Sequence, residues 1–348
     1  MVFTGAFAYI QWAKESTFGT AATVACGNAF GFEQKITGWS FTNNKIPLSQ
    51  LNDVRVKTYA YGQTRGSLSL DFVLSSPWFL GIIGFKDATS SCAPAPYTHT
   101  FEIDDTSATK NIKSFTTQIG QEAGGTDIVR TLTGGIVNSA SISTSVGELA
   151  KVTLDTNYKN EALTTALDGT PASLTVCEAI PFTFAHGTLE WTDGACENNV
   201  IAEVQDVNIT FTQNSDHIWG IGNSTANSAI RRLFEITGSF KSSHVNTDEL
   251  VKVYAQQKDT KGNTCPAQTQ SVTAIDGTAA VQLKLTFDNG EAGTDSRKFE
   301  FTFTGIALDD INVSIEPNEP IFEDINWQAI GCTVVATNNT ATEPAATP

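Results

Sequence analysis

Basic side chains are scarce in this sequence, and they do not cluster. Of 348 residues, 21 are Lys or Arg and 37 are Asp or Glu, which gives a formal net charge of −16. The longest basic run is the pair Arg231-Arg232. Proteins that grip nucleic acid draw their affinity from clustered Lys and Arg that neutralise phosphates. We therefore expect no tight binding of DNA or RNA.

Motifs for catalysis, metals and cofactors are also missing. The sequence has no G-x-S-x-G elbow, no phosphate-binding G-x-x-x-x-G-K-[ST] loop and no H-x-H or C-x-x-C pair. We expect a protein that is not an enzyme and has no cofactor or metal. The six cysteines allow two interpretations, buried free thiols or disulfides formed after release from a cell, and their spacing does not choose between them.

Long hydrophobic runs are absent as well. The first residues, Met1 to Phe7, lack the basic start and apolar stretch of a signal peptide. No apolar run approaches the roughly 20 residues of a membrane helix. The sequence therefore predicts a protein made in the cytoplasm, with no membrane partner.

What the sequence does have is the composition and alternation of β-strands. Hydrophobic residues make up 40% and charged residues 17%, enough apolar material for packed cores. Residues 67–72 alternate strictly, with Leu68, Leu70 and Phe72 on one side. Residues 97–103, 281–287 and 299–303 alternate in the same way, and Asp288-Asn289-Gly290 is typical of a hairpin turn. The pattern predicts an all-β protein.

Two short helices are the exceptions that we predict. Ser76 and Pro77 suit a helix start, and the apolar residues from Trp78 to Ile83 would bury that helix. Asn246 with Glu249 resembles a capping box for a second helix that continues to Tyr254. The predicted fold is therefore all-β with minor α.

The chain also resembles itself at an offset of about half its length. Residues 39–44 resemble 209–214 at an offset of 170, and residues 132–134 resemble 303–305 at an offset of 171. Residues 66–72, 80–83 and 141–142 find weaker matches at 234–240, 250–253 and 314–315. The order is kept throughout, so we expect two tandem units, 1–178 and 179–348, with a flexible tail from about residue 337.

Matched long connections interrupt both units, at residues 44–65 and 215–232. Loops of this length are usually functional or disordered, and disordered loops rarely carry so many apolar residues. The connections could contact partner subunits or fold back on their own domain, and we favour partner contact. The residues assigned to these contacts are Ile46, Leu48, Leu51, Val54, Tyr59, Tyr61, Ile218, Trp219 and Ile221.

The order of these motifs resembles a known family. Glu15-Ser16-Thr17-Phe18-Gly19-Thr20 comes first, then Trp39-Ser40-Phe41, the long connection, residues 66–72 and the apolar helix. Residues 305–308 and 315–320 follow near the end. This order resembles the tail tube proteins of long-tailed viruses of bacteria and archaea. The resemblance implies a β-sandwich or partial barrel with one flanking helix per unit, and a place in the virion tail.

The resemblance also implies partners. Six such units complete a ring in this family, so a duplicated chain would need three copies, and stacked rings would form a hollow tube that conducts DNA. The chain would contact itself and other tail proteins. We expect the polar side chains Ser67, Ser69, Asp71, Glu235, Thr237 and Ser239 to line the lumen. The alternatives are another virion assembly protein (decoration, baseplate or tail terminator) or a cell-surface β-sandwich filament protein.

Overall fold

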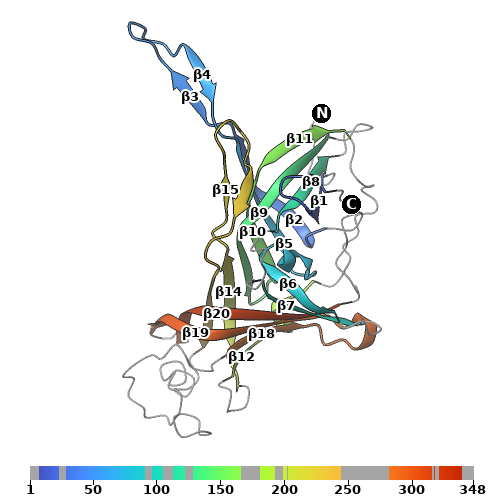
Figure 1. Cartoon of the computed structure of the whole chain (residues 1–348). Coiled ribbons are helices and arrows are strands. Elements are labelled where there is room, and N and C mark those ends of the chain that lie inside the picture. The colour runs from blue at the N-terminus through green and yellow to red at the C-terminus, as the bar shows by residue number, and fades with distance from the viewer. Residues whose placement is uncertain are drawn as a thin grey trace.

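The computed structural model describes residues 8–22, 29–90, 96–104, 113–121, 128–165, 181–192, 199–201, 203–243, 282–315, 317 and 321–338. These residues form twenty β-strands and three short 3₁₀ helices (Figure 1). None of the helices among them has the length and hydrophobicity to cross a membrane. The predicted all-β class is confirmed.

The strands of the first half are β1 (Ala8–Lys14), β2 (Phe32–Thr42), β3 (Lys45–Leu48), β4 (Thr58–Tyr61), β5 (Arg65–Val73), β6 (Phe85–Ser90), β7 (Tyr97–Ile103), β8 (Phe115–Gln121), β9 (Ile128–Ser145), β10 (Lys151–Tyr158) and β11 (Asn160–Thr164). Those of the second half are β12 (Gly187–Thr192), β13 (Asn199–Val200), β14 (Val204–Thr212), β15 (Asp216–Ile218), β16 (Ser228–Ile230), β17 (Glu235–Ser243), β18 (Gln282–Asp288), β19 (Lys298–Ser314) and β20 (Phe322–Asn338). The 3₁₀ helices are η2 (Trp78–Gly81), η4 (Phe184–His186) and η5 (Gly293–Asp295).

One open antiparallel sheet runs through both halves of the chain. Its order is β13-β12-β18-β19-β20-β17-β14-β9-β10-β5-β2, and β1, β6, β7, β8 and β11 join it at the side. Four strands of the first half lie in the order β9-β10-β5-β2, and four of the second half in the order β19-β20-β17-β14. The pairing of β9 with β14 joins the two sets.

Both sets contain the same irregularity. The β9–β10 ladder skips Asn138, and the β19–β20 ladder skips Asp309 at an offset of 171. Gly134 and Gly305, also 171 apart, both have positive φ, +66° and +64°. A bulge and a glycine kink bend a strand at defined positions, so β9 and β19 bend at matching points.

The core lies on one face of the sheet. Leu70, Leu154, Ala140, Phe211 and Ile236 are consecutive partners across five strands, and all are buried. The 3₁₀ helix η2 covers this face from the side with the buried Trp78, Phe79 and Leu80. The sheet therefore has one face packed against the chain's own core.

Several local predictions can be compared with this structure. The strands at 67–72 and 97–103 and the hairpin after Phe287 are confirmed, and Gly290 has the expected positive φ of 72°. The helix after Pro77 is buried as predicted, but it is a four-residue 3₁₀ helix. The helix predicted from Asn246 to Tyr254 lies outside the described residues.

Candidate assembly surfaces

In the two sets of four strands, β9-β10-β5-β2 and β19-β20-β17-β14, the outermost strands have edges with no partner among the described strands. β2 pairs only with β5, so its other edge is open. In β19, residues 306–314 pair only with β20, whereas residues 298–304 also pair with β18. An open strand edge presents a row of unpaired N–H and C=O groups that another strand can use. These edges are therefore candidate sites for strand pairing between chains.

The junction of β9 with β14 shows how such an edge is closed inside the chain. Ile142 pairs with Ile209 and Ala140 pairs with Phe211. All four side chains are at most 1% exposed. On the core side of the sheet, the internal junction is thus a buried, apolar contact.

The corresponding positions on the open edges are exposed. Offsets of 170 and 171 relate Phe211 to Phe41 and Ile142 to Val313. Phe41 is 39% exposed and Val313 is 46% exposed, and Ile315 near the end of β19 is more exposed still. Two of the four side chains that are buried at the internal junction therefore have exposed counterparts, one at each open edge.

Each set also carries a projecting hairpin of the same length. We call residues 43–64 arm 1 and residues 213–234 arm 2, and each has 22 residues between its flanking strands. Lys45 pairs with Tyr61 in arm 1, and Asp216 pairs with Ile230 in arm 2. Both arms were predicted as long loops, but each contains a short β-ladder, in the same register at an offset of 170.

Arm 2 lies on the first half of its own chain. The backbone N–H of Gln213 donates to Asn138 O, and Ser215 Oγ donates to Val137 O over 2.7 Å. His217 Nε2 lies 3.2 Å from Gly134 O, and burial lowers the pKa of this histidine. Near the tip of the arm, Ser224 O accepts a hydrogen bond from the backbone N–H of Thr64 at the base of arm 1.

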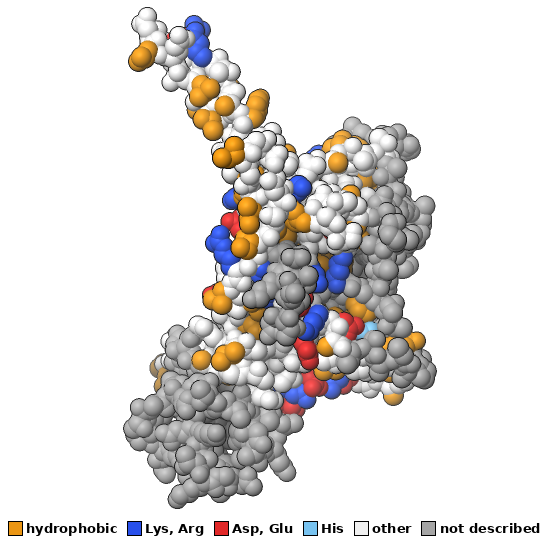
Figure 2. Space-filling model, in the orientation of Figure 1, with side chains coloured by type: hydrophobic (Ala, Val, Ile, Leu, Met, Phe, Trp, Pro, Cys, Tyr) orange, Lys and Arg blue, Asp and Glu red, His pale blue; other side chains and the backbone are white. Residues whose placement is uncertain are grey.

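Arm 1 extends away from the sheet (Figure 1). Within the described residues, none of the hydrogen bonds or ion pairs made by residues 43–62 leaves the arm. Figure 2 shows hydrophobic side chains spaced along it. The exposed residues among those predicted to contact partners are Ile46, Leu48, Leu51, Val54, Tyr59 and Tyr61 in arm 1, and Ile218 and Ile221 in arm 2.

Trp219 is the one predicted contact residue that is held within the chain. The guanidinium carbon of Arg65 lies 4.9 Å from its ring centroid, and the His217 ring meets it edge-on at 5.9 Å. Arg65 also lies 3.8 Å from the carboxylate of Asp216. This cluster attaches arm 2 to the first half of the chain.

The face of the sheet opposite the core is polar across its width. Asp71, Thr153, Ser141, Thr210, Thr237 and Gln328 are successive partners on six neighbouring strands. Ser69 and Glu235 belong to the next row, through Asp155, Ser139 and Thr212. The side chains predicted to line a lumen, Ser67, Ser69, Asp71, Glu235, Thr237 and Ser239, thus share one face.

The polar face carries charges of both signs, and two of its carboxylates are hydrogen-bonded to neighbouring hydroxyl groups. Asp155 accepts from Ser69 over 2.6 Å and from Ser139 over 3.3 Å, and Asp71 accepts from Thr153. By the alternation of their strands, Lys151 in β10, Asp206 in β14 and Lys241 in β17 also lie on this face. The pKa of Asp206 is raised mainly by burial. The face therefore offers hydroxyls and scattered charges, with no basic cluster.

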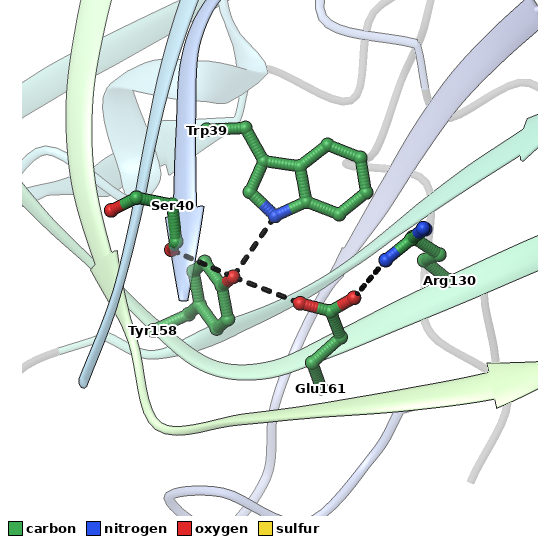
Figure 3. A network of polar contacts seen from close by, with 5 residues as sticks. All are labelled: Trp39, Ser40, Arg130, Tyr158 and Glu161. Atoms are coloured by element: carbon green, nitrogen blue, oxygen red, sulfur yellow. Dashed lines mark hydrogen bonds and ion pairs between the residues drawn. The ribbon is translucent and has the colours of Figure 1, made fainter. Parts of the chain in front are cut away.

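A network of polar side chains fastens the edge strand β2 to the sheet (Figure 3). The indole N–H of Trp39 donates to the Tyr158 hydroxyl over 2.9 Å, and that hydroxyl lies 3.0 Å from both Ser40 O and Glu161 Oε2. Arg130 completes the network through a 2.6 Å bond to Glu161 Oε1. The Tyr158 ring occupies the space that a side chain at Gly66 would need.

Replacing Tyr158 by Phe should lower the free energy of unfolding by about 1–3 kcal/mol, because it leaves polar partners without the hydroxyl. Burial raises the pKa of Tyr158 well above its ordinary value. In the unfolded chain, tyrosine ionises at about pH 10. The stability of the wild type should therefore fall above that pH, and the variant should lack this part of the decline. Urea unfolding at pH 8 to 11 measures both effects.

The exposed Tyr59 provides a matched control for this prediction. Tyr59→Phe should leave the unfolding free energy nearly unchanged at every pH. Equal stability of wild type and Tyr158→Phe would show that the network does not secure β2.

Glu15 holds distant segments together through hydrogen bonds that the sequence did not reveal. Its carboxylate accepts from the amides of Gly19 and Gly134, each over 2.7 Å, and from Thr116 Oγ1 over 2.9 Å. Gly19 has φ +71°, a conformation that favours glycine. The Glu-x-x-Phe-Gly-Thr motif therefore forms a tight turn that ties the start of the chain to the kink in β9.

No three His, Cys, Asp or Glu side chains come together as a metal site within the described part of the chain. Cys332 is the one cysteine that lies there, and it is a buried free thiol whose pKa is raised by burial.

No curated protein matches this sequence, but the family described as phage tail tube protein matches residues 5–329. That span is nearly the whole chain, and it includes both arms, the open edges and both strand sets except residues 330–338 of β20. The chain therefore belongs to the phage tail tube protein family and is a structural protein of the virion tail.

Proposed function

We propose that three copies of this chain close into a ring with pseudo-six-fold symmetry, and that stacked rings form a hollow tube that conducts DNA. The observation that carries the proposal is the β9–β14 junction. It joins two alike sets of four strands head to tail, and the outermost strands of the combined sets keep an open edge, along β2 and along residues 306–314 of β19. Head-to-tail contacts of this kind close into rings when the rotation allows.

The duplication of a unit, 1–178 and 179–348, is part of this proposal. It is supported by the equal strand orders, the bulges at Asn138 and Asp309 and the kinks at Gly134 and Gly305. Asn44 and Asn214 at the starts of the two arms also share positive φ. A constant offset of 170 or 171 over these features favours two copies of one fold.

The internal junction also predicts the register between chains. Thr210 pairs with Ser141 inside the chain, so Ser40 should pair with Asn312 of the next chain. By the same offsets, Trp39 should lie opposite Val313 and Phe41 opposite Ile311. Closing these edges would bury the exposed Phe41 and Val313 and leave no free edge in the ring sheet.

The polar face would line the tube. Its opposite face is covered by the chain's own core, including η2, so the bulk of each chain would lie outside the ring. Hydroxyls and scattered charges of both signs would make few strong phosphate contacts, and DNA could then slide. No step of this function requires catalysis.

Stacking would use the ends of the arms. Leu51 in arm 1 and Ile221 in arm 2 are 170 residues apart and are both fully exposed. Aliphatic side chains exposed at the ends of projecting hairpins are available to lose water against another chain. We assign these residues to the contact between rings, and the tube would meet other tail proteins at its two ends.

Cross-linking of assembled protein tests the ring. Ser40→Cys combined with Asn312→Cys should give dimers and trimers on oxidation, with no larger covalent species, because the ring closes at three chains. The matched control is Ser141→Cys with Thr210→Cys, which should cross-link within one chain. Electron microscopy of the same samples should show hollow tubes. Isolated rings without tubes would favour a tail terminator, and monomers that never cross-link would overturn the proposal.

A further inference from the structure

We infer that each chain donates a strand, residues 268–274, to the open edge of β11 in the neighbouring chain. We call these residues the donor segment, so the occupant of the edge is a named segment of a second copy. The inference rests on the proposed ring and adds a second contact between the same two chains, separate from the pairing of β2 with β19. It starts from an exchange of strands that the chain already makes between its own two halves.

On the N-terminal side of their kinks, β9 and β19 build the same ladder. Residues 160–164 of β11 pair with residues 129–133 of β9. Residues 331–335 of β20 pair with residues 300–304 of β19, at an offset of 171 on both strands. On the other side, β8 and β1 extend the first ladder in the same order in which β18 and β12 extend the second. β11 and the C-terminal half of β20 are therefore equivalent strands.

Among the described strands, the far edge is covered on β20 but not on β11. β7 comes from the first half of the chain, and it pairs with residues 333–338 of β20 in the second half. Val334 is 0% exposed there, and its partner Phe101 is 2% exposed. β11 pairs with β9 alone, and Leu163, the counterpart of Val334, is 66% exposed. The β11 edge can therefore accept a strand, as the equivalent edge of β20 does.

The sequence contains a counterpart of β7. Residues 98–103, Thr-His-Thr-Phe-Glu-Ile, match the last six residues of the donor segment, Thr-Gln-Ser-Val-Thr-Ala, in polarity at every position and at the same offset of 171. The match is one of sequence, since the donor segment lies outside the described residues. Val272 corresponds to Phe101 and would lie opposite Leu163 of the acceptor. The segment contains no proline, so each of its backbone N–H groups can donate.

The connections on either side of the donor segment allow it to leave its own half. In the first half, 23 residues separate β5 from β7, and in the second half 24 separate β17 from the donor segment. Seven residues then lead on to β18, against eleven between β7 and β8. Seven extended residues span roughly 23–25 Å, which is about five strand spacings. The donor segment can therefore reach a strand that does not neighbour β18.

The direction of the exchange selects a neighbouring chain as the acceptor. β7 belongs to the half that supplies β9 to the internal junction, and it crosses to the half that supplies β14. The donor segment belongs to the half that supplies β19, and in the proposed ring the strand equivalent to β14 is then β2 of the next chain. The equivalent acceptor is therefore β11 of that chain. Pairing with β11 of the same chain would run the exchange backwards across the β9–β14 junction.

Cysteine pairs in assembled tubes test the exchange. Thr100 and Val335 are partners in the β7–β20 ladder, and their counterparts are Ser271 and Thr164. Thr100→Cys with Val335→Cys is the matched internal pair and should cross-link within one chain, before and after assembly. Ser271→Cys with Thr164→Cys should cross-link only in tubes and give covalent dimers and trimers. Wild type and each single variant are treated alongside, because the chain has six cysteines of its own.

Mixed tubes separate contacts between chains from contacts within one. Tubes assembled from equal amounts of the single variants Ser271→Cys and Thr164→Cys should give covalent dimers and nothing larger, because each link joins one chain of each kind. A link within single chains of the double variant would place the donor segment on its own β11 and overturn the inference. Covalent ladders longer than three chains would place it on another ring, with the same consequence.

The edge pair Ser40→Cys/Asn312→Cys distinguishes failure of this inference from failure of the ring. If the edge pair reacts in tubes and Ser271→Cys/Thr164→Cys does not, the exchange is wrong and the ring stands. Failure of the edge pair in assembled tubes would instead reject the ring geometry itself.

Discussion

Val313→Lys should abolish tube assembly and leave the isolated chain folded. Val313 is 46% exposed in the single chain, so a lysine there keeps its charge in water. In the proposed ring, this position corresponds to Ile142, which is 1% exposed at the internal junction. Burying an unpaired charge costs several kcal/mol, and about 4 kcal/mol per junction corresponds to roughly a thousand-fold weaker contact.

Two measurements separate assembly from folding in this prediction. Sedimentation of the purified variant should show monomers at concentrations where wild type forms tubes, and its thermal unfolding midpoint should match that of unassembled wild type. The internal counterpart Ile142→Lys should instead unfold the chain, because the same charge is then buried in every monomer. Tubes formed by Val313→Lys at wild-type concentrations would disprove pairing of β19 with a neighbour.

Local patterns in the sequence were sufficient to predict individual strands. Strict alternation identified residues 67–72, which fall within β5, and Asp288-Asn289-Gly290 identified the turn between β18 and β19. Both signals depend on residues close together in the chain. The apolar residues after Pro77 predicted burial correctly, but they form a four-residue 3₁₀ helix. This helix ends at Gly81, and Gly84, three residues later, has a positive φ of 101°.

Contacts between distant segments could not be read from the sequence. The junction of β9 with β14 pairs residues that are far apart in the sequence; Ile142 and Ile209, for example, are 67 positions apart. The two arms were noticed as apolar connections, but nothing in their composition showed that one lies on the chain and the other extends away from it. Arm 2 is held by backbone carbonyl groups of β9, which any residue type can supply.

The exposure of the apolar residues in the arms could be predicted from the sequence, whereas the contacts that hold the strands together could not. Exposed apolar residues in a long connection are a signal in themselves, and Leu51, Val54 and Ile221 are fully exposed. The network of Trp39, Tyr158 and Glu161 carries no such signal, because its members are ordinary strand residues and Trp39 lies 119 positions from Tyr158. Glu15 stood within a motif, but its bonds to Thr116 and Gly134 follow only from the fold.

Thr210→Arg combined with Thr237→Arg should convert a tube that releases DNA into one that holds it. The two positions are direct partners in the middle of the polar face. In a ring of three chains the change adds six positive charges to the lumen, and stacking repeats them along the tube. Duplex DNA carries one negative charge per about 1.7 Å, so many phosphates can be neutralised at once. Wild-type tubes, with their mixed charges and hydroxyls, should retain little DNA.

Co-sedimentation of short duplex DNA with assembled tubes, repeated over a range of salt concentrations, measures this change. The logarithm of the affinity should fall linearly with the logarithm of salt, with a slope near −0.9 for each phosphate neutralised. Thr210→Gln with Thr237→Gln adds polar bulk without charge and should behave as wild type. DNA held inside the tube should also resist nuclease, because the wall excludes the enzyme. Retained DNA that nuclease digests fully would place these threonines on the outer surface, and the polar face would then not line the lumen.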